Sequence, residues 1–318
     1  MNKLFRFFLF VHFYLNDRLD IRWKQIATTI AGGKGPGNRS DQLNHPLGIS
    51  LDDQNHLLYI ADSDNHRIVE WGLDRNNGRI VAGGNGQGNR LDQLNKPSHV
   101  ISDRQNKDLI IVDRGNRRVM RWSHHSNLPL QIVIEDTDCV RLAMHEDGSL
   151  YVCDCDKHEV RRWKKGEKQG TIVAGGNGQG YQRNQFNSPT YLFVNHDYSL
   201  YISDWENHRV MKWLKDAKEG IIVAGGNGRG DRLTQLSNPQ GVIVDQFGRI
   251  YVADWGNHRV MRWCEGEKEG TIVVGGNGQG QDKNQLDHPV GLLFDGEGNL
   301  YVSDRGNDRI VKFEKYLD

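Results

Sequence analysis

The feature that most constrains this chain is an internal repeat of about 50 residues. Each unit contains a short apolar run that ends in aspartate, as in YIAD, YVCD and YVAD. A regular period of this length is typical of folds that repeat one supersecondary unit. The aspartates follow one another at intervals of 51, 41, 50, 50 and 50 residues, so there are six units and one is short. They are Asp62, Asp113, Asp154, Asp204, Asp254 and Asp304.

The fifth unit shows how each repeat is organised. Apolar runs at Gly241–Asp245 (GVIVD) and Arg249–Asp254 (RIYVAD) are separated by a turn that contains Gly248. Further runs follow at Asn257–Trp263 (NHRVMRW) and Gly270–Gly276 (GTIVVGG), and no helical period connects them. Four short strands bounded by turn residues match one propeller blade. The sequence therefore predicts an all-β, six-bladed β-propeller of four-stranded antiparallel blades.

The two ends of the sequence predict how the propeller closes. The last unit supplies only three strands, at Val290–Phe294, Asn299–Ser303 and Asp308–Phe313, whereas Ala27–Ala31 is a strand without a unit of its own. Pairing residues 27–31 with the last unit completes the sixth blade and removes an exposed sheet edge. We assign residues 22–318 to the propeller.

Residues 1–21 differ from the repeats, and their role stays open. Leu4–Leu15 is apolar and aromatic but contains Arg6 and His12, and a bilayer span needs about 20 apolar residues. Lys3 before an apolar stretch resembles a signal peptide, although no small-x-small cleavage site follows. We favour the cytoplasm as the compartment. Secretion requires that residues 1–15 act as a signal, and membrane contact requires that the apolar segment is retained.

Five glycine-rich loops invite comparison with phosphate-binding loops. The sequence VAGGNGQG stands at Val81–Gly88 and Val173–Gly180, and close variants occupy Ile30–Gly37, Val223–Gly230 and Val273–Gly280. Another strand follows each loop, and neither GK[ST] nor the G-x-G-x-x-G spacing is present, so the signature of a nucleotide site is missing. We interpret the loops as connections between blades in which glycine adopts positive φ, and we expect no cofactor.

Other residues recur with the same regularity, and we interpret them as scaffold. Asp and Asn readily bond the backbone of their own turn, so the repeated Asp and Asn should brace each loop. The repeated Arg should lie between blades near those carboxylates, and the repeated Trp should pack blade against blade. The residues are Asn65, Asn116, Asn207, Asn257 and Asn307; Arg67, Arg118, Arg209, Arg259 and Arg309; and Trp71, Trp122, Trp163, Trp213 and Trp263, with Phe313 in the last unit.

The motif YVADWGNHRVMRW at Tyr251–Trp263, preceded by PQGVIVDQFG, resembles the NHL-repeat propeller family. The resemblance covers residues 22–318 and recurs six times. NHL propellers commonly bind proteins or peptides, often as the substrate-recruiting part of tripartite-motif ubiquitin ligases. The resemblance therefore implies a non-catalytic interaction module, with substrate recruitment for ubiquitination as one use. The sequence has no RING or B-box cysteine/histidine array and no coiled coil.

If the repeated residues are scaffold, recognition should lie where equivalent positions differ. The position after each repeated aspartate should ring one face, and it holds Ser63, Arg114, Cys155, Trp205, Trp255 and Arg305. Trp and Arg are enriched in binding hot spots. The alternative is that the Trp side chains lie flat on neighbouring loops.

A second variable position lies at the start of the inner strands. It holds Gly48, His99, Arg141, Tyr191, Gly241 and Gly291. Three consecutive units carry large polar groups and the other three carry glycine, so we expect a channel mouth that is lined on one side and open at the glycines. The short third unit, with LPLQIVIEDTDCV in place of a glycine loop, should leave a notch beside Arg141 and Cys155. The predicted partner-binding residues are His99, Arg114, Arg141, Cys155, Tyr191, Trp205, Trp255 and Arg305.

Charge and histidine placement bear on the alternatives. The 41 basic and 41 acidic residues give zero net charge, so DNA is not expected. RNA binding would need a local patch around Arg114, Arg141 and Arg305. A zinc lyase of the peptidyl-hydroxyglycine lyase type needs several convergent His, whereas the mouth offers only His99. A second group, Cys153, Cys155 and His158 with Cys139 near by, lacks the paired C-x2-C spacing of structural zinc sites. We expect no metal site, with His66, His208 and His258 acting as scaffold, and no catalytic residue.

Overall fold

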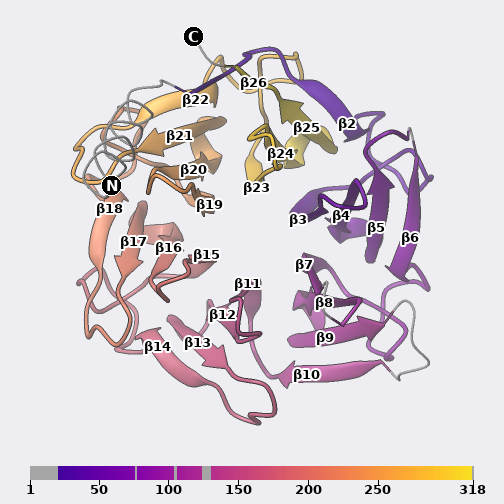
Figure 1. Ribbon diagram of the computed structural model, residues 1–318, viewed down its shortest axis with the longest axis horizontal. Helices are drawn as coiled ribbons and strands as arrows, with labels where there is room; N and C mark the ends of the chain where they lie inside the picture. The colour runs from indigo at the N-terminus through magenta and orange to yellow at the C-terminus, as the bar shows by residue number, and fades with distance from the viewer. Residues whose placement is uncertain (1–20, 76, 104–105, 124–129, 317–318) are drawn as a thin grey trace, which may run out of the picture.

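The computed structural model describes residues 21–75, 77–103, 106–123 and 130–316, and in these residues it shows six four-stranded antiparallel sheets arranged around an axis (Figure 1). Blade 1 contains β3 (Pro46–Asp52), β4 (Leu57–Asp62), β5 (Arg67–Gly72) and β6 (Gly78–Gly83). Blade 2 contains β7 (Pro97–Asp103), β8 (Asp108–Asp113), β9 (Arg118–Ser123) and β10 (Gln131–Glu135). Blade 3 contains β11 (Cys139–Met144), β12 (Leu150–Asp154), β13 (Glu159–Trp163) and β14 (Thr171–Gly175).

The second half of the chain repeats the same order from the axis outward. Blade 4 contains β15 (Pro189–Val194), β16 (Leu200–Asp204), β17 (Arg209–Trp213) and β18 (Ile221–Gly225). Blade 5 contains β19 (Pro239–Val244), β20 (Ile250–Asp254), β21 (Arg259–Trp263) and β22 (Thr271–Gly275). Blade 6 contains β23 (Pro289–Phe294), β24 (Leu300–Asp304), β25 (Arg309–Phe313) and, from the other end of the chain, β2 (Thr28–Gly32). The predicted fold class is confirmed.

Closure by the N-terminal strand is confirmed as well. β2 pairs antiparallel with β25, with Thr28 opposite Lys312 and Gly32 opposite Arg309, so the strand lies one residue later than the expected 27–31. A two-residue ladder between β1 (Arg22–Trp23) and β26 (Lys315–Tyr316) adds a second join between the ends. The apolar segment of residues 1–20 lies outside the described residues, and its assignment stays a prediction. No helix among the described residues has the length and apolar character needed to cross a bilayer.

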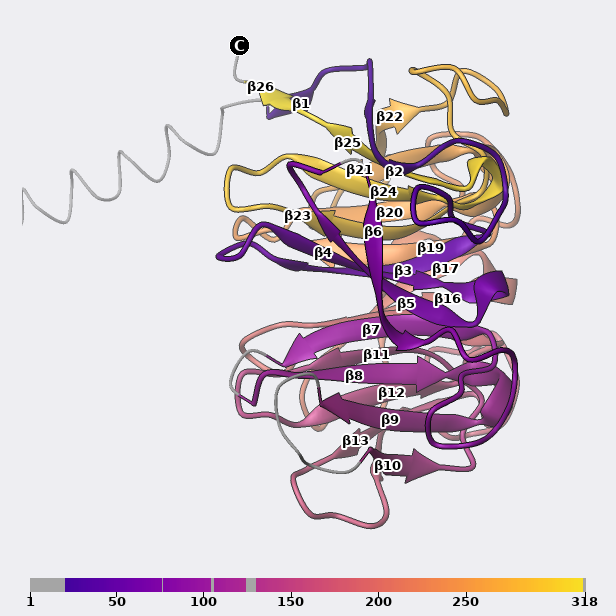
Figure 2. The same cartoon turned by 90° about the vertical axis from the view of Figure 1, so that its right-hand side faces the viewer.

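Two faces of the propeller follow from the strand directions. We call the upper face the one that carries the glycine loops and the short 3-10 turns, which follow the second strand in every blade except blade 3. These turns are η1 (Ser63–Asn65), η2 (Arg114–Asn116), η3 (Trp205–Asn207), η4 (Trp255–Asn257) and η5 (Arg305–Asn307). The lower face carries the other turns of each blade and the β1–β26 ladder (Figure 2).

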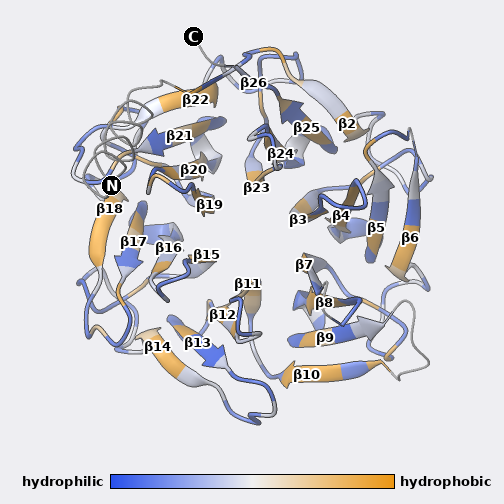
Figure 3. Cartoon of the chain, in the orientation of Figure 1, coloured by the Kyte–Doolittle hydropathy of each residue, from blue (hydrophilic) through white to orange (hydrophobic). Residues whose placement is uncertain are grey.

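The cores lie mainly between adjacent blades. Trp71 of blade 1, for example, is buried together with Tyr301 and Ile310 of blade 6. Trp71, Trp213, Trp263 and Phe313 are almost fully buried, as expected of side chains that pack blade against blade. Trp122 in blade 2 and Trp163 in blade 3, the two blades joined by the shortened connection, are only half-buried. On the outer strands isoleucines such as Ile80, Ile172 and Ile221 are exposed, and Figure 3 shows these strands as apolar patches on the perimeter.

A recurring set of contacts, which we call the loop clasp, ties each glycine loop to the blade that follows it. In blade 5, Asn257 Nδ2 and Arg259 Nε donate to Asp254 Oδ2 at 2.7 and 2.8 Å. The Arg259 guanidinium also donates to loop carbonyls, including that of Gln235 at 3.4 Å. The clasp recurs in blades 1, 2, 4 and 6 around Asp62, Asp113, Asp204 and Asp304. This confirms the structural interpretation of the repeated Asp, Asn and Arg.

Glycine is required in these loops for a reason that the structure shows directly. Gly275 has φ +74°, and a Cβ there would lie 2.7 Å from the carbonyl oxygen of His258. An L side chain is strained in this conformation and has no room for its first carbon. The loops therefore turn the chain from the outer strand of one blade to the inner strand of the next.

Blade 3 lacks the clasp because it lacks the loop. Its Asp154 accepts hydrogen bonds from Thr137 Oγ1 and the Lys157 backbone, at 3.2 and 3.1 Å. Glu159 takes the place of the clasp arginine and pairs with Arg161. The shortened connection from β10 to β11 thus changes the residues that would otherwise hold it.

Candidate functional site

A basin of about 560 Å³ opens on the upper face over the axis of the propeller. Its floor is built from the second residue of each inner strand, so all six blades contribute. These residues are Leu47, Ser98, Val140, Thr190, Gln240 and Val290. Apolar and polar residues both line the basin, and its volume is in the range of pockets that hold a small ligand or a side chain.

The rim of the basin comes from the turns that follow the second strands. Arg114, Cys155, Trp205, Trp255 and Arg305 line it, and Tyr191 lines the basin as well. Six of the eight predicted partner-binding residues therefore meet at one cavity. The other two, His99 and Arg141, lie outside its lining.

The two rim tryptophans contact each other and are half-buried. The ring centroids of Trp205 and Trp255 are 5.2 Å apart, with the planes tilted by 57°. Trp255 also packs against His288, with ring centroids 4.0 Å apart. Trp205 Nε1 donates to Glu206 Oε1 at 2.9 Å. Side-chain contacts thus fix both indole rings while part of each remains accessible beside the basin.

The charges around the basin are of both signs. Arg114 Nε donates to Asp138 at 3.3 Å, and Asp138, Asp156 and Glu206 line the same cavity as Arg114 and Arg305. Phosphate backbones are bound by clusters of Lys and Arg with little competing negative charge. The lining does not form the basic patch that the RNA alternative requires.

The structure corrects the placement of three predicted contact residues. His99, Tyr191 and Cys155 are buried, at 2%, 1% and 8% exposed, and so are not surface side chains. The His99 ring lies against Gly48, where an added Cβ would collide with it. Cys155 lies near the carbonyl oxygen of Pro189, and burial raises the pKa of its thiol.

The expected opening at the glycine positions is also wrong. A Cβ on Gly241 or Gly291 would meet the carbonyl oxygen of Val290 or Leu47 in the next blade. These glycines let neighbouring inner strands approach closely, so that side of the axis is closed by backbone. The error has a structural source, because each inner strand has a register shift near its start, as between Pro46 and Ile49. A bulge breaks the alternation of side chains along a strand, and the floor residues that the sequence reasoning missed stand one position earlier.

The described residues contain one group that fits the criteria for a metal site, formed by His258, Asp287 and His288. His288 Nδ1 lies 2.6 Å from Asp287 Oδ1, which is a hydrogen-bond distance. Two ligands that each lie about 2.0 Å from a tetrahedral zinc are separated by roughly 3.3 Å. His258 Nδ1 accepts the backbone N–H of His288, as His66, His158 and His208 do for the residues at the equivalent positions in their units. The His288–Asp287 pair is closer than two zinc ligands would be, so the three residues are arranged as a hydrogen-bonded network.

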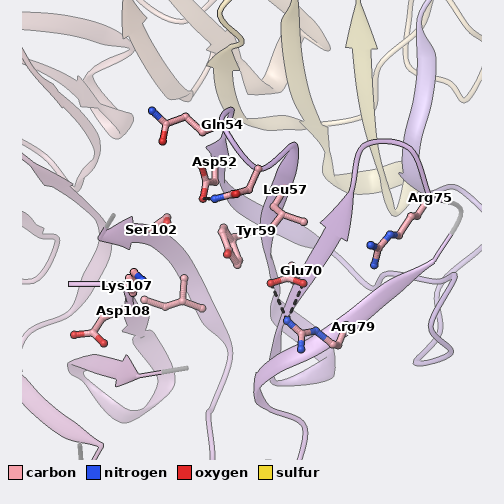
Figure 4. A pocket seen from close by; sticks show the side chains of 12 residues that line it. Asp52, Gln54, Leu57, Tyr59, Glu70, Arg75, Arg79, Ser102, Lys107 and Asp108 are labelled. Carbon is pink, nitrogen blue, oxygen red and sulfur yellow. Dashed lines mark hydrogen bonds and ion pairs between the residues drawn. The ribbon is translucent and has the colours of Figure 1, made fainter. Parts of the chain in front are cut away.

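A larger cavity, of about 980 Å³, lies on the lower face between blades 1 and 2 (Figure 4). Arg79 faces both carboxylate oxygens of Glu70, at 2.9 and 3.1 Å (Figure 4). Burial and the nearby Glu70 and Asp52 carboxylates raise the pKa of Tyr59 to about 12. Only two blades form this cavity, and Glu70 and Arg79 neutralise each other. We therefore take the upper basin as the candidate site.

Comparison with known proteins supports the repeat and the fold. The sequence model of the NHL repeat matches residues 43–71 and 236–262, in blades 1 and 5. No curated protein matches the sequence. Among solved structures, an auxiliary nutrient binding protein from Bacteroides thetaiotaomicron VPI-5482 is 17% identical, has a TM-score of 0.70, and is matched over 92% of this chain and 77% of its own.

Enzymes share the architecture too. A gluconolactonase from Xanthomonas campestris is 12% identical, with a TM-score of 0.64 and coverage of 92% of this chain and 98% of that chain. A virginiamycin B lyase from Staphylococcus aureus is 11% identical, with a TM-score of 0.57 and coverage of 92% and 99%. At such identities the likeness shows the fold alone, because one fold serves many functions.

Proposed function

Since this chain is an NHL-repeat β-propeller, we propose that it is a non-catalytic module that binds a protein or peptide in the upper basin. The observation that carries the proposal is the convergence of six blades on one cavity flanked by Trp205 and Trp255. Half-buried tryptophans whose positions are fixed lose little conformational entropy on binding, and they are the most enriched residues in binding hot spots. Recruitment of a substrate for ubiquitination is one use of such binding.

The character of the floor favours a short segment or a side chain as the occupant. Leu47, Val140 and Val290 supply apolar surface, while Ser98, Thr190 and Gln240 supply polar groups. Apolar area drives the burial of a side chain, and a few polar groups set its orientation. The rim charges of both signs suit the polar edge of a protein interface.

Selection from a random peptide display library against the immobilised protein tests this function. We expect enriched peptides whose affinity falls about 10- to 100-fold in Trp205→Ala and Trp255→Ala, as for hot-spot tryptophans. Leu214→Ala is the matched control, because Leu214 is an exposed apolar residue, 46% exposed, on the lower face. A selection that enriches no peptide, or peptides that are insensitive to both tryptophan variants, contradicts the proposal.

A further inference from the structure

A layer of polar side chains lies next to the basin floor, and several of its buried polar atoms have no hydrogen-bond partner among the described residues. His99, Arg141 and Tyr191 come from three consecutive inner strands, and Ser98 precedes His99. The Ser98 and Tyr191 hydroxyls and both ring nitrogens of His99 are buried without a hydrogen-bond partner in the described part of the chain. Buried polar groups are almost always satisfied, so a cluster of unsatisfied ones calls for an occupant.

Arg141 is the charged member of this layer. Its guanidinium carbon lies 4.4 Å from the centroid of the Tyr191 ring. Nε and Nη1 are shut off from solvent and have no partner among the described residues, although the side chain as a whole keeps some exposure. The clasp arginines differ, since Arg67, for example, donates to Asp62 at 2.7 Å. A sheltered cation without a counter-ion is costly, because desolvation is not offset by a paired charge.

The groups around Arg141 do not supply the missing negative charge. Burial and the charge of Arg141 hold the pKa of His99 well below its usual value. Burial raises the pKa of Tyr191 and of Cys153, so both are neutral near pH 7. Within the described residues, no carboxylate lies close enough to form an ion pair with Arg141. The layer therefore carries a net charge of one positive unit.

We propose that the occupant of the basin extends a carboxylate past the floor to Arg141, which lies outside the lining but packs on the ring of the basin-lining Tyr191, with the Tyr191 and Ser98 hydroxyls as further donors. A carboxylate has the single negative charge that one guanidinium neutralises, and its two oxygens match the planar guanidinium donors. A phosphate dianion would leave excess negative charge in a sheltered site. This inference rests on the proposed function, because it assigns the chemistry of the group that the same basin recognises.

Two sources of carboxylate fit a peptide partner: an Asp or Glu side chain and the C-terminal carboxylate. Peptides enriched by the display selection separate them. Replacement of the acidic residue by its amide weakens binding in the first case, and C-terminal amidation weakens it in the second. We expect one of the two changes to lower affinity about 10- to 100-fold, as for loss of a charged hydrogen bond in a sheltered site.

Sodium acetate serves as a probe that does not require an identified partner. We expect the thermal midpoint of the full chain to rise with acetate above its value in sodium chloride of equal ionic strength. The rise should disappear in Arg141→Met and persist in Arg232→Met, where the arginine is exposed in the connection between β18 and β19. Tyr191→Phe supplies an isosteric second variant that leaves Arg141 in place, and it should reduce the acetate effect several-fold at unchanged far-UV circular dichroism.

The outcomes distinguish this inference from the proposed function. Peptides that bind through Trp205 and Trp255 but tolerate loss of every carboxylate and Arg141→Met overturn the inference and leave the function standing. An acetate effect that depends on Arg141, in a protein that enriches no peptide, supports the carboxylate site and contradicts peptide binding. Equal midpoints in acetate and chloride overturn the site.

Discussion

Blades 3 and 5 have the same four strands but differ at the upper face. In blade 5 the clasp residues Asp254, Asn257 and Arg259 hold a glycine loop. In blade 3 the loop is absent, and Glu159 stands where the clasp arginine would be. An arginine there would lack the loop carbonyls that the other clasp arginines bind. Loop and clasp are therefore one unit that is present or absent together, and the blade without them is the one that supplies Arg141.

The largest expected effect breaks the clasp in the regular blade. Arg259→Met leaves the fully buried Asp254 carboxylate without its cation, and loss of one partner from a buried pair costs about 3–5 kcal/mol. Glu159→Gln at the equivalent position of blade 3 should cost about 1 kcal/mol, because the amide still accepts from Arg161, which is partly exposed. Urea unfolding at pH 7 measures both. Equal losses of stability would show that the residue at this position stabilises the two blades to the same extent.

A smaller effect is expected within the glycine loop that leaves blade 5. Gly275→Ala forces a positive φ on an L residue and a collision with the carbonyl oxygen of His258, and should cost about 3 kcal/mol. Gly278→Ala has φ +81° but no atom nearer than 3.9 Å, so only the backbone term of about 1 kcal/mol applies. Chemical denaturation of the two variants gives the difference. Similar values would mean that the loop can shift away from its blade.

The smallest expected effect concerns His99, which belongs to the half of the inner strands that carries large polar side chains instead of glycine. His99 has a lowered pKa in the folded protein, whereas it protonates near pH 6.5 when unfolded. Acid therefore favours the unfolded chain, and stability that is complete above pH 6.5 is lost as the pH falls. Between pH 7 and pH 5.5 the wild type should lose about 1 kcal/mol more than His99→Gln. Parallel stability curves for the two proteins over this range would contradict a neutral, buried His99.

The sequence predicts the fold well because repetition makes each strand visible six times. The strand that closes blade 6, for example, is displaced by only one residue from its expected position. The candidate site is harder to predict, since the bulge at the start of each inner strand shifts which side chain faces the axis. Trp205, Trp255, Arg114 and Arg305 each begin a 3-10 turn of constant geometry, and they lie at the basin as expected. His99 was misplaced because only the structure reveals how closely its blade approaches Gly48.

The ladder between β1 and β26 also determines which face points outward when the propeller is immobilised through its C-terminal end. Trp23 Nε1 donates to the carbonyl oxygen of Gly298 at 3.0 Å, which places the ladder on the lower face. A tether joined beyond Tyr316 therefore leaves from the side opposite the basin. A biosensor chip loaded through that end would display the basin outward, so a large analyte could reach it without steric interference from the support.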